Sequence, residues 1–367
     1  MLEIDRTRLR ELLRQEQAEY ERLHPTSRQL YEDATHLFGK VPMTWMNMWS
    51  GGFPLSFERA RGNHVVDVDG LEYVDFALGD TGAMAGHSPR PTVRAIEVRI
   101  RDMGGITTML PTADASWVGN ELARRFGLTL WSFTLSATDA NRWAIRLARA
   151  VTGRPKIICF SYSYHGSVDE THTFSAGPGG ATAAWGLRPD ILVIGKSIGG
   201  GIPCGAYGIT EDVGLAVDAL VARGEADVED VGGVGGTLAG NAMSVAAMRA
   251  TLSEVLTEDA FADMIDRATG FTEGVRSVIE RCRLPWSITQ LGARTEYRFT
   301  PDPPRDGESS AAVADTELDT YLHLGLANRG ILMTPFHNMA LMCPTTSDDD
   351  VDRHTTAFGD LVDTLVG

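Results

Sequence analysis

The stretch that decides the fold runs from Asp190 to Pro203 and reads DILVIGKSIGGGIP. Residues 191–194 form a short, wholly apolar run, which is typical of a strand that is buried on both faces. Lys196 follows at the carboxyl end of this run and precedes three consecutive glycines. Because ligands bind beyond the carboxyl ends of strands in open α/β sheets, we interpret Lys196 as a candidate nucleophile for a carbonyl group. The alternative is an ordinary exposed lysine in a glycine-rich loop.

The sequence upstream of this stretch alternates between helical and strand patterns. Such alternation predicts βαβ units and therefore a mainly parallel sheet. Helices are expected at residues 91–101, 115–126 and 139–151. Short apolar strands are expected at residues 131–135 and 156–160.

The remaining patterns predict smaller parts on either side. Residues 3–37 look helical and are divided at Pro25, and residues 55–76 suggest an antiparallel meander. After residue 256 a smaller α+β region follows, with helices expected at 258–282 and 316–329, a strand around 295–299 and a last helix from Ser347. We therefore expect an N-terminal helical segment and loop (1–60), a large domain (61–256) and a small C-terminal domain (257–367).

Composition excludes several classes of function. With 33 basic and 49 acidic residues the net charge is −16, which argues against nucleic-acid binding. We find no apolar stretch of membrane-spanning length and no signal peptide, and we expect a cytoplasmic protein. The four cysteines and nine histidines show no metal-ligand spacing, so no metal site is expected. The acidic run Asp348–Asp350 is better interpreted as the first turn of a helix.

Four further segments are suited to a phosphorylated aromatic cofactor. Residues 133–141 run from a strand through Ser136 and Thr138 into a helix, whose N-terminus could bind an anion or simply be capped. Tyr164 could stack on a heterocycle or pack at the sheet edge. Asp169 could hold a pyridine nitrogen protonated or be a helix-capping or surface acid. A glycine-rich loop at 232–241 is another possible phosphate contact.

Together these segments resemble the class III aminotransferases, which are fold-type I enzymes dependent on pyridoxal 5'-phosphate, and most of all their glutamate-1-semialdehyde aminomutase-like branch. The resemblance covers nearly the whole chain. It is carried by residues 66–70 and 73–75, Gly86-His87, residues 136–141, Tyr164-His165-Gly166, Asp169-Glu170, Lys196, Gly236-Thr237 and residues 330–335.

The resemblance implies an α/β fold and a role for each motif. It implies that Lys196 is the Schiff-base lysine and proton shuttle, and that Asp169 is the partner of the pyridine nitrogen. Ala137 stands where the family usually has glycine. The other cofactor contacts implied are the stacking ring of Tyr164 with its neighbour His165, the phosphate cup at Ala137 and Thr138, and Thr237, which the family donates from the neighbouring subunit of a homodimer.

One departure concerns the spacing of two motifs. Only Ser167 and Val168 lie between Gly166 and Asp169, whereas a parallel crossover connection needs about a dozen residues or more. The sequence therefore predicts a central segment that is shortened after Gly166, unless the printed chain abridges a longer one. A direct repeat of the Asp-Glu-Thr phrase at the edges of a lost segment would explain the join.

The expected activity is that of an aminotransferase acting on an amino acid or amino ketone, with a small amino donor and a keto acceptor. The alternatives are an aminomutase or racemase of the same fold, or a relative that is catalytically defective because of the shortened segment. Trp45 and Trp49 could line a substrate pocket or pack in the core or an interface. Arg294 could bind a carboxylate, although a strand arginine is more often solvated or structurally paired.

Overall fold

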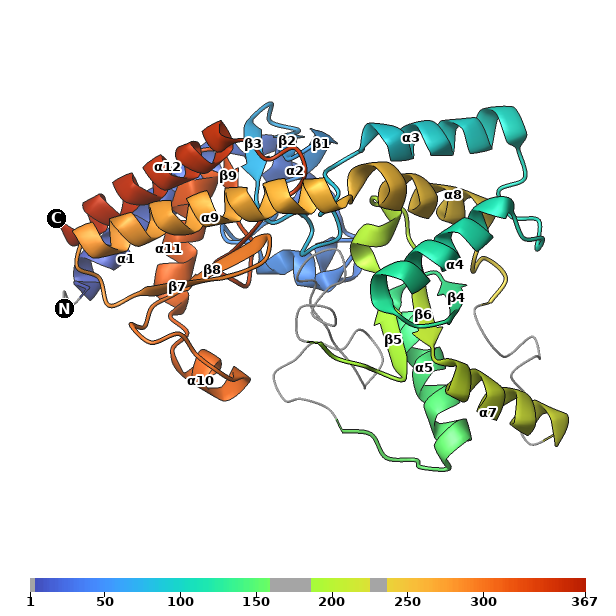
Figure 1. Cartoon of the computed structure of the whole chain (residues 1–367). Helices are drawn as coiled ribbons and strands as arrows, with labels where there is room; N and C mark the ends of the chain where they lie inside the picture. The colour runs from blue at the N-terminus through green and yellow to red at the C-terminus, as the bar shows by residue number, and fades with distance from the viewer. Residues whose placement is uncertain (1–3, 159–185, 225–235) are drawn as a thin grey trace. The chain divides into compact units, whose positions relative to one another are not determined.

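The computed structural model describes residues 4–158, 186–224 and 236–367, which divide into two compact units (Figure 1). The terminal unit joins Met1–His87 to Ala262–Gly367, and the central unit is Ser88–Phe261. Residues 61–87, which we expected in the large domain, thus belong with the C-terminal residues. The cause is a strand pairing in which Val74 and Asp75 lie beside Ile331 and Leu332.

The terminal unit begins with two helices, α1 (Arg6–Leu23) and α2 (Pro25–Asp33). Asp5 caps α1 by accepting hydrogen bonds from the backbone N–H groups of Thr7 and Arg8. Pro25 is the first residue of α2, where its missing N–H costs nothing. The predicted division at Pro25 is therefore confirmed. Two 3₁₀ turns follow, η1 (Phe38–Lys40) and η2 (Thr44–Met48).

The predicted meander is confirmed as the strands β1 (Phe57–Arg61), β2 (His64–Asp67) and β3 (Glu72–Asp75), which pair antiparallel in sequence order. The short strand β9 (Ile331–Leu332) adds to β3 in parallel. A second sheet has the order β10-β8-β7. Its strands are β7 (Ser287–Leu291), β8 (Arg294–Arg298) and β10 (Met339–Leu341).

Four more helices belong to this unit: α9 (Glu258–Arg281), whose first residues lie in the central unit, α10 (Gly307–Ala312), α11 (Thr316–Ala327) and α12 (Asp348–Val366). The acidic run does start a helix, because Ser347 caps α12 and exchanges hydrogen bonds with Asp350. Although α1 and α12 stand at opposite ends of the chain, they lie side by side (Figure 1), and Arg8 Nε donates to the Thr364 carbonyl at 2.8 Å.

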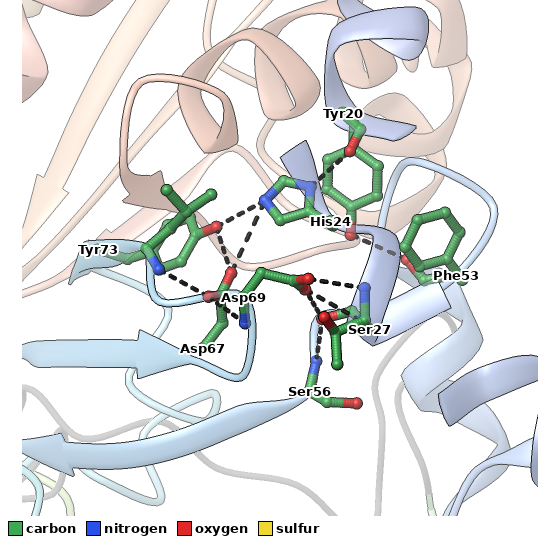
Figure 2. A network of polar contacts seen from close by, with 10 residues as sticks. Tyr20, His24, Ser27, Phe53, Ser56, Asp67, Asp69 and Tyr73 are labelled. Carbon is green, nitrogen blue, oxygen red and sulfur yellow. Dashed lines mark hydrogen bonds and ion pairs between the residues drawn. The ribbon is translucent and has the colours of Figure 1, made fainter. Parts of the chain in front are cut away.

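A buried polar network fastens the helices α1 and α2 to the meander (Figure 2). The ring of His24 is fully buried between the helices, and its Nδ1 donates to the Tyr20 carbonyl at 2.7 Å. The Tyr73 hydroxyl lies 2.7 Å from Nε2 of His24 and donates to Asp67 Oδ2, also at 2.7 Å. Two segments that are distant in sequence are thus joined by side chains that water does not reach.

Asp69 adds a second link in the same network (Figure 2). Its carboxylate accepts hydrogen bonds from the N–H groups of Thr26 and Ser27 at the start of α2, at 2.7 and 3.0 Å, and from the Ser27 hydroxyl. Burial alone raises the pKa of this carboxyl, but these hydrogen bonds outweigh it and hold the pKa below its usual range. Asp69 therefore acts as a charged cap for α2.

The central unit contains helices packed around a small sheet. In its described residues the strands in chain order are β4 (Leu130–Thr134), β5 (Ile191–Ile194) and β6 (Gly205–Ile209). The helices of these residues are α3 (Arg90–Glu97), α4 (Ala113–Phe126), α5 (Ala137–Thr152), α7 (Glu211–Ala222) and α8 (Ala242–Ala250). They also form the π-helical turns η3 (Val98–Met103) and η5 (Thr251–Val255) and the 3₁₀ turn η4 (Lys196–Gly199).

The described sheet of the central unit differs in detail from the mainly parallel one that we expected. Its order is β4-β6-β5, and β6 pairs antiparallel with both neighbours. The short glycine-rich connection between β5 and β6 suits an antiparallel pair, whereas a parallel pair needs a long crossover. Of the strand expected at 156–160, residues 156–158 form no strand, and the rest lies outside the described residues.

A buried apolar cluster holds the sheet to the helices. Ile198, directly after Lys196 and Ser197, is 2% exposed and belongs to this cluster. The other members are Cys204, just before β6, and residues of α4, β6, α8 and η5, namely Val118, Leu122, Ala206, Val245, Met248 and Leu252. Burial of Ile198 fixes the turn that carries Lys196 to the core of the unit.

Candidate active site

Lys196 lies just beyond the carboxyl end of β5, as the sequence predicts. It begins the turn η4, its side chain is exposed, and its backbone has φ of 49°. A left-handed backbone is strained for a residue other than glycine, and such strain persists where surrounding contacts enforce it, often at functional sites. The turn closes where the Gly200 N–H donates to the Ser197 carbonyl at 3.1 Å.

Two glycines beside Lys196 bring the first turn of α5 into contact with the strand ends. A Cβ atom added to Gly195 would lie 2.8 Å from Cβ and 3.0 Å from N of Ala137. A Cβ atom on Gly205 would lie 2.5 Å from the carbonyl carbon of Ser136. Since real Cβ atoms do not approach so closely, only glycine fits at both positions. The candidate lysine and the candidate phosphate cup are therefore brought together within one unit.

The first turn of α5 has the features of an anion site. Ser136 caps the helix, because its hydroxyl accepts from the Asp139 N–H at 3.2 Å and donates to Asp139 Oδ2 at 3.1 Å. The N–H groups of a first helical turn have no carbonyl within the helix to bind, and they carry the positive end of the helix dipole. Ala137 and Thr138 thus stand where a phosphate could be bound.

Ala137 also shows how the chain accommodates a methyl group where the family usually has glycine. A Cβ atom added to Gly195 would lie 2.8 Å from the Cβ of Ala137. The extra methyl of Ala137 therefore lies beside the lysine strand, opposite a residue that has no side chain.

Thr237 follows Gly236 in the loop before α8 and is exposed. The loop is anchored by Asn241, whose side chain accepts from the Ser244 N–H at 2.9 Å. A Cβ atom added to Gly240 would lie 3.7 Å from Cβ of Phe133 on β4. The loop therefore passes close to the strand that leads to the candidate phosphate cup. Whether Thr237 serves the neighbouring subunit stays a prediction.

Three sequence-predicted residues lie outside the described residues, namely Tyr164, His165 and Asp169. Their roles as stacking ring, motif neighbour and partner of the pyridine nitrogen stay predictions. The short join between Gly166 and Asp169 lies in the same segment.

The three residues proposed for substrate belong to the terminal unit. Trp45 packs edge-to-face on Phe336, with ring centroids 6.1 Å apart, and Trp49 is half-buried directly after η2. Arg294 donates to Glu296 Oε2 at 2.8 Å, which favours the structurally paired interpretation of this arginine.

Glu296 is a centre of charge that sequence patterns did not reveal. Burial raises its pKa, but the close approach of His337 and the charge of Arg294, which also donates a hydrogen bond, outweigh this and lower the pKa to about 2. Its ionised carboxylate lies within 3.4 Å of Arg298 and of His337 as well. Alternation of Arg and Glu along one strand was the available signal, since such side chains share a face.

Across residues 4–158, 186–224 and 236–367, His, Cys, Asp and Glu side chains form no group of three or more that could hold a metal ion. Within those ranges no helix has both the length and the apolar character to span a bilayer.

Comparison with known proteins agrees with this arrangement. Residues 45–177 and 168–362 match the sequence profile of the class-III aminotransferases. The chain belongs to this family. The resemblance and the fold class predicted from the sequence are thereby confirmed, and the chain is a member of an enzyme family.

Several members of the family and its fold are similar to this chain. It is 37% identical to a glutamate-1-semialdehyde aminomutase from Pseudomonas aeruginosa PAO1, with a TM-score of 0.93 over 99% of this chain and 100% of that one. A lysine-to-alanine variant of that protein was solved in complex with PMP. A β-phenylalanine aminotransferase from Variovorax paradoxus shares the fold, at 23% identity and a TM-score of 0.85 over 97% of both chains.

The lengths of the matches bear on the shortened segment. The chain is 24% identical to the glutamate-1-semialdehyde 2,1-aminomutase of Anaeromyxobacter dehalogenans strain 2CP-C in an alignment of 425 residues that covers 96% of that protein. That alignment is longer than this class-III chain of 367 residues, of which it covers 90%. Some positions of the relative therefore have no counterpart here. The two profile matches overlap at 168–177, which begins just after Gly166 and is consistent with a join there.

Proposed function

We propose that this chain is a pyridoxal-phosphate-dependent aminotransferase that acts on an amino acid or amino ketone through Lys196. The single observation that carries the proposal is the contact between the Lys196 strand and the first turn of α5. A lysine amine and an anion-binding helix terminus in one unit fit a cofactor that has both an aldehyde and a phosphate.

Each residue of the site has a role in this proposal. Lys196 would bind the cofactor covalently, give way to the substrate amine and then move the proton at the carbon that carries the amino group. Ala137 and Thr138 would hold the phosphate by their backbone N–H groups, and Thr237 of the neighbouring subunit would add a contact. When bound, pyridoxal phosphate supplies an electron sink that makes this proton acidic.

The pyridine side of the site is proposed from sequence alone. Tyr164 would stack on the ring, with His165 beside it, and Asp169 would keep the pyridine nitrogen protonated. The assembly would be a homodimer that takes a small amino donor and a keto acceptor in the cytoplasm.

An aminomutase is the second candidate function. It is favoured by the 37% identity to the Pseudomonas aeruginosa aminomutase. Both activities begin with the same bond formation at the lysine and differ in whether a keto product leaves. A racemase on the same scaffold would also retain its product amine.

A half-reaction assay separates these functions. Purified protein loaded with pyridoxal phosphate is mixed with one amino donor and no acceptor. Stoichiometric release of a keto product, with conversion of the cofactor to pyridoxamine phosphate, supports the aminotransferase. Isomerisation or racemisation without keto release contradicts it.

The third possibility is a catalytically defective relative, since the shortened segment includes Asp169. Borohydride reduction followed by peptide mass mapping tests it. Covalent labelling at Lys196 supports the proposed enzyme, and a protein that shows neither visible absorbance nor labelling would be the defective relative.

A further inference from the structure

Beneath the turn that follows Lys196 lie two threonines that sequence patterns did not connect. Thr92 is in the first turn of α3, and Thr251 begins η5, so they stand 159 positions apart in the chain. Their hydroxyl oxygens are 2.8 Å apart, which is a hydrogen bond, and the two residues are 1% and 0% exposed. Water therefore cannot replace either partner.

The Lys196 turn rests directly on this pair. A Cβ atom added to Gly200 would lie 2.6 Å from Thr251 Oγ1 and 2.9 Å from Thr92 Oγ1. Gly200 has φ of 58° and ends the turn η4 that Lys196 begins. The two hydroxyls thus occupy the space that any side chain at position 200 would need, so the Gly200 backbone can pass close to them only because it carries none.

We propose that Thr92 and Thr251 are positioning residues for Lys196: their paired hydroxyls form the floor that holds the Lys196 turn in its strained, left-handed conformation. The inference rests on the proposed function of Lys196 and deepens it. Neither threonine is a catalytic residue, because each acts only through the backbone of Gly200.

The chemistry of a hydroxyl pair explains why threonine suits this position. Two hydrogen-bonded oxygens lie at about 2.7–2.8 Å, whereas two methyl carbons are in optimal contact only at about 3.5–4.0 Å. Valine has the shape of threonine but replaces the hydroxyl with a methyl group. Thr251→Val would put a methyl carbon where the Thr251 hydroxyl now lies 2.8 Å from Thr92 Oγ1. The methyl must therefore separate η5 from α3, or push the Gly200 backbone outward, by up to about 1 Å.

Two measurements on cofactor-free protein separate positioning from general damage. The first is the rate at which Lys196 captures pyridoxal phosphate, followed by absorbance and located by borohydride reduction and peptide mass. The second is the affinity for pyridoxamine phosphate, which has no carbonyl group and so tests the phosphate cup without the lysine. Tryptophan fluorescence reports the second.

We expect Thr251→Val to slow the capture of pyridoxal phosphate by about tenfold or more, because misplacing a reacting group by about 1 Å can lower a reaction rate by about a hundredfold. Pyridoxamine phosphate affinity should stay within about twofold, since α5 is unchanged. Thr251→Ser keeps the hydroxyl and should restore the rate. Thr272→Val is the matched control, because Thr272 and Thr295 form a similar buried hydroxyl pair, 2.9 Å apart, in the terminal unit.

Amide hydrogen exchange measures the stability of the Lys196 turn in the absence of cofactor. The Gly200 and Ile202 amides, which donate to the Ser197 and Gly199 carbonyls, should exchange faster in Thr251→Val but not in the control. If Thr251→Val does not fold, Gly200→Ala tests the same contact. It should likewise slow the capture of pyridoxal phosphate and leave the affinity for pyridoxamine phosphate unchanged.

The outcomes distinguish this inference from the proposed function. Unchanged capture and unchanged exchange in Thr251→Val overturn the positioning role, and so does an equal loss of capture and of pyridoxamine phosphate affinity. A wild-type protein that never forms an adduct at Lys196 overturns the proposed function instead, and the exchange experiment still decides whether the threonines hold the turn.

Discussion

His354 should make the protein lose stability in mild acid. It lies on α12, is 0% exposed, and stacks on Phe271 with ring centroids 4.1 Å apart. Phe358 and Phe76 lie against it at 5.8 and 5.7 Å. Neither ring nitrogen has a hydrogen-bond partner in the described part of the chain. Burial without a counter-charge lowers the pKa of His354 from 6.5 to about 3.

The sign and size of the effect follow from these two values. Below about pH 6.5 the unfolded chain binds a proton on His354 that the folded protein does not, so stability falls as pH falls, and the loss levels off near pH 3. Because the folded-state pKa lies far below that of the unfolded chain, the full loss amounts to several kcal/mol, on the order of 1.4 kcal/mol for each tenfold change in proton affinity. Between about pH 7.5 and pH 5 the loss is about 2 kcal/mol, still a large fraction of typical protein stability.

The substitution His354→Phe tests this reasoning. It removes the titrating group from an aromatic environment, so the variant should gain about 2 kcal/mol over wild type on going from about pH 7.5 to pH 5. It should also be more stable at neutral pH by about 1–3 kcal/mol, because an unpartnered polar group is lost. Urea unfolding midpoints at both pH values give the difference.

Two further variants control the result. His354→Leu is included in case phenylalanine is too large for the buried site. His36→Gln, at an exposed position, controls for the loss of a histidine as such. If wild type and both His354 variants lose the same stability between the two pH values, burial does not disfavour the charged ring and the reasoning fails.

Three other perturbations test separate parts of the structure. Tyr73→Phe removes the hydroxyl that donates to Asp67 and should lower the free energy of unfolding by about 1–3 kcal/mol. Thermal unfolding measures the effect, and an unchanged melting temperature would contradict a stabilising role of the network. Ser347→Ala removes the cap of α12 and should cost about 1 kcal/mol, seen in urea unfolding. Gly195→Ala places a methyl group 2.8 Å from the Cβ of Ala137 and should slow cofactor capture by about tenfold or more. Adding Ala137→Gly should restore part of the capture rate. If it restores none, the clash is not with the Ala137 methyl group.

The parts of the fold that the sequence predicted have local causes. Pro25 starts a helix because it lacks an N–H group, and the Ser347 cap with its acidic first turn depends on four consecutive residues. Lys196 was found because a short apolar run ended in one lysine and several glycines. Each of these signals lies within a few positions of the chain.

The strand β6 was missed because its residues give no strand signal. It reads GAYGI, and glycine and alanine are depleted in strands. Its small residues are needed by its neighbours, since a Cβ atom on Gly208 would lie 2.6 Å from the ring of Trp131 on β4. The composition that hid this strand therefore results from close packing, which only the folded chain shows.

The contacts around Lys196 also explain how the two sides of the candidate site differ. The lysine is held by α5 through Gly195, by the core through Ile198, and by α3 and η5 through Gly200. All of these contacts lie in the described part of the central unit, away in sequence from the shortened join at Gly166. In the proposed function, the lysine and phosphate roles would therefore depend on residues that pack well together, whereas the electron-sink role would depend on Asp169. A chain of this kind can retain cofactor capture and phosphate recognition even where proton abstraction is slow, so binding and turnover must be measured separately to identify which side of the site is altered.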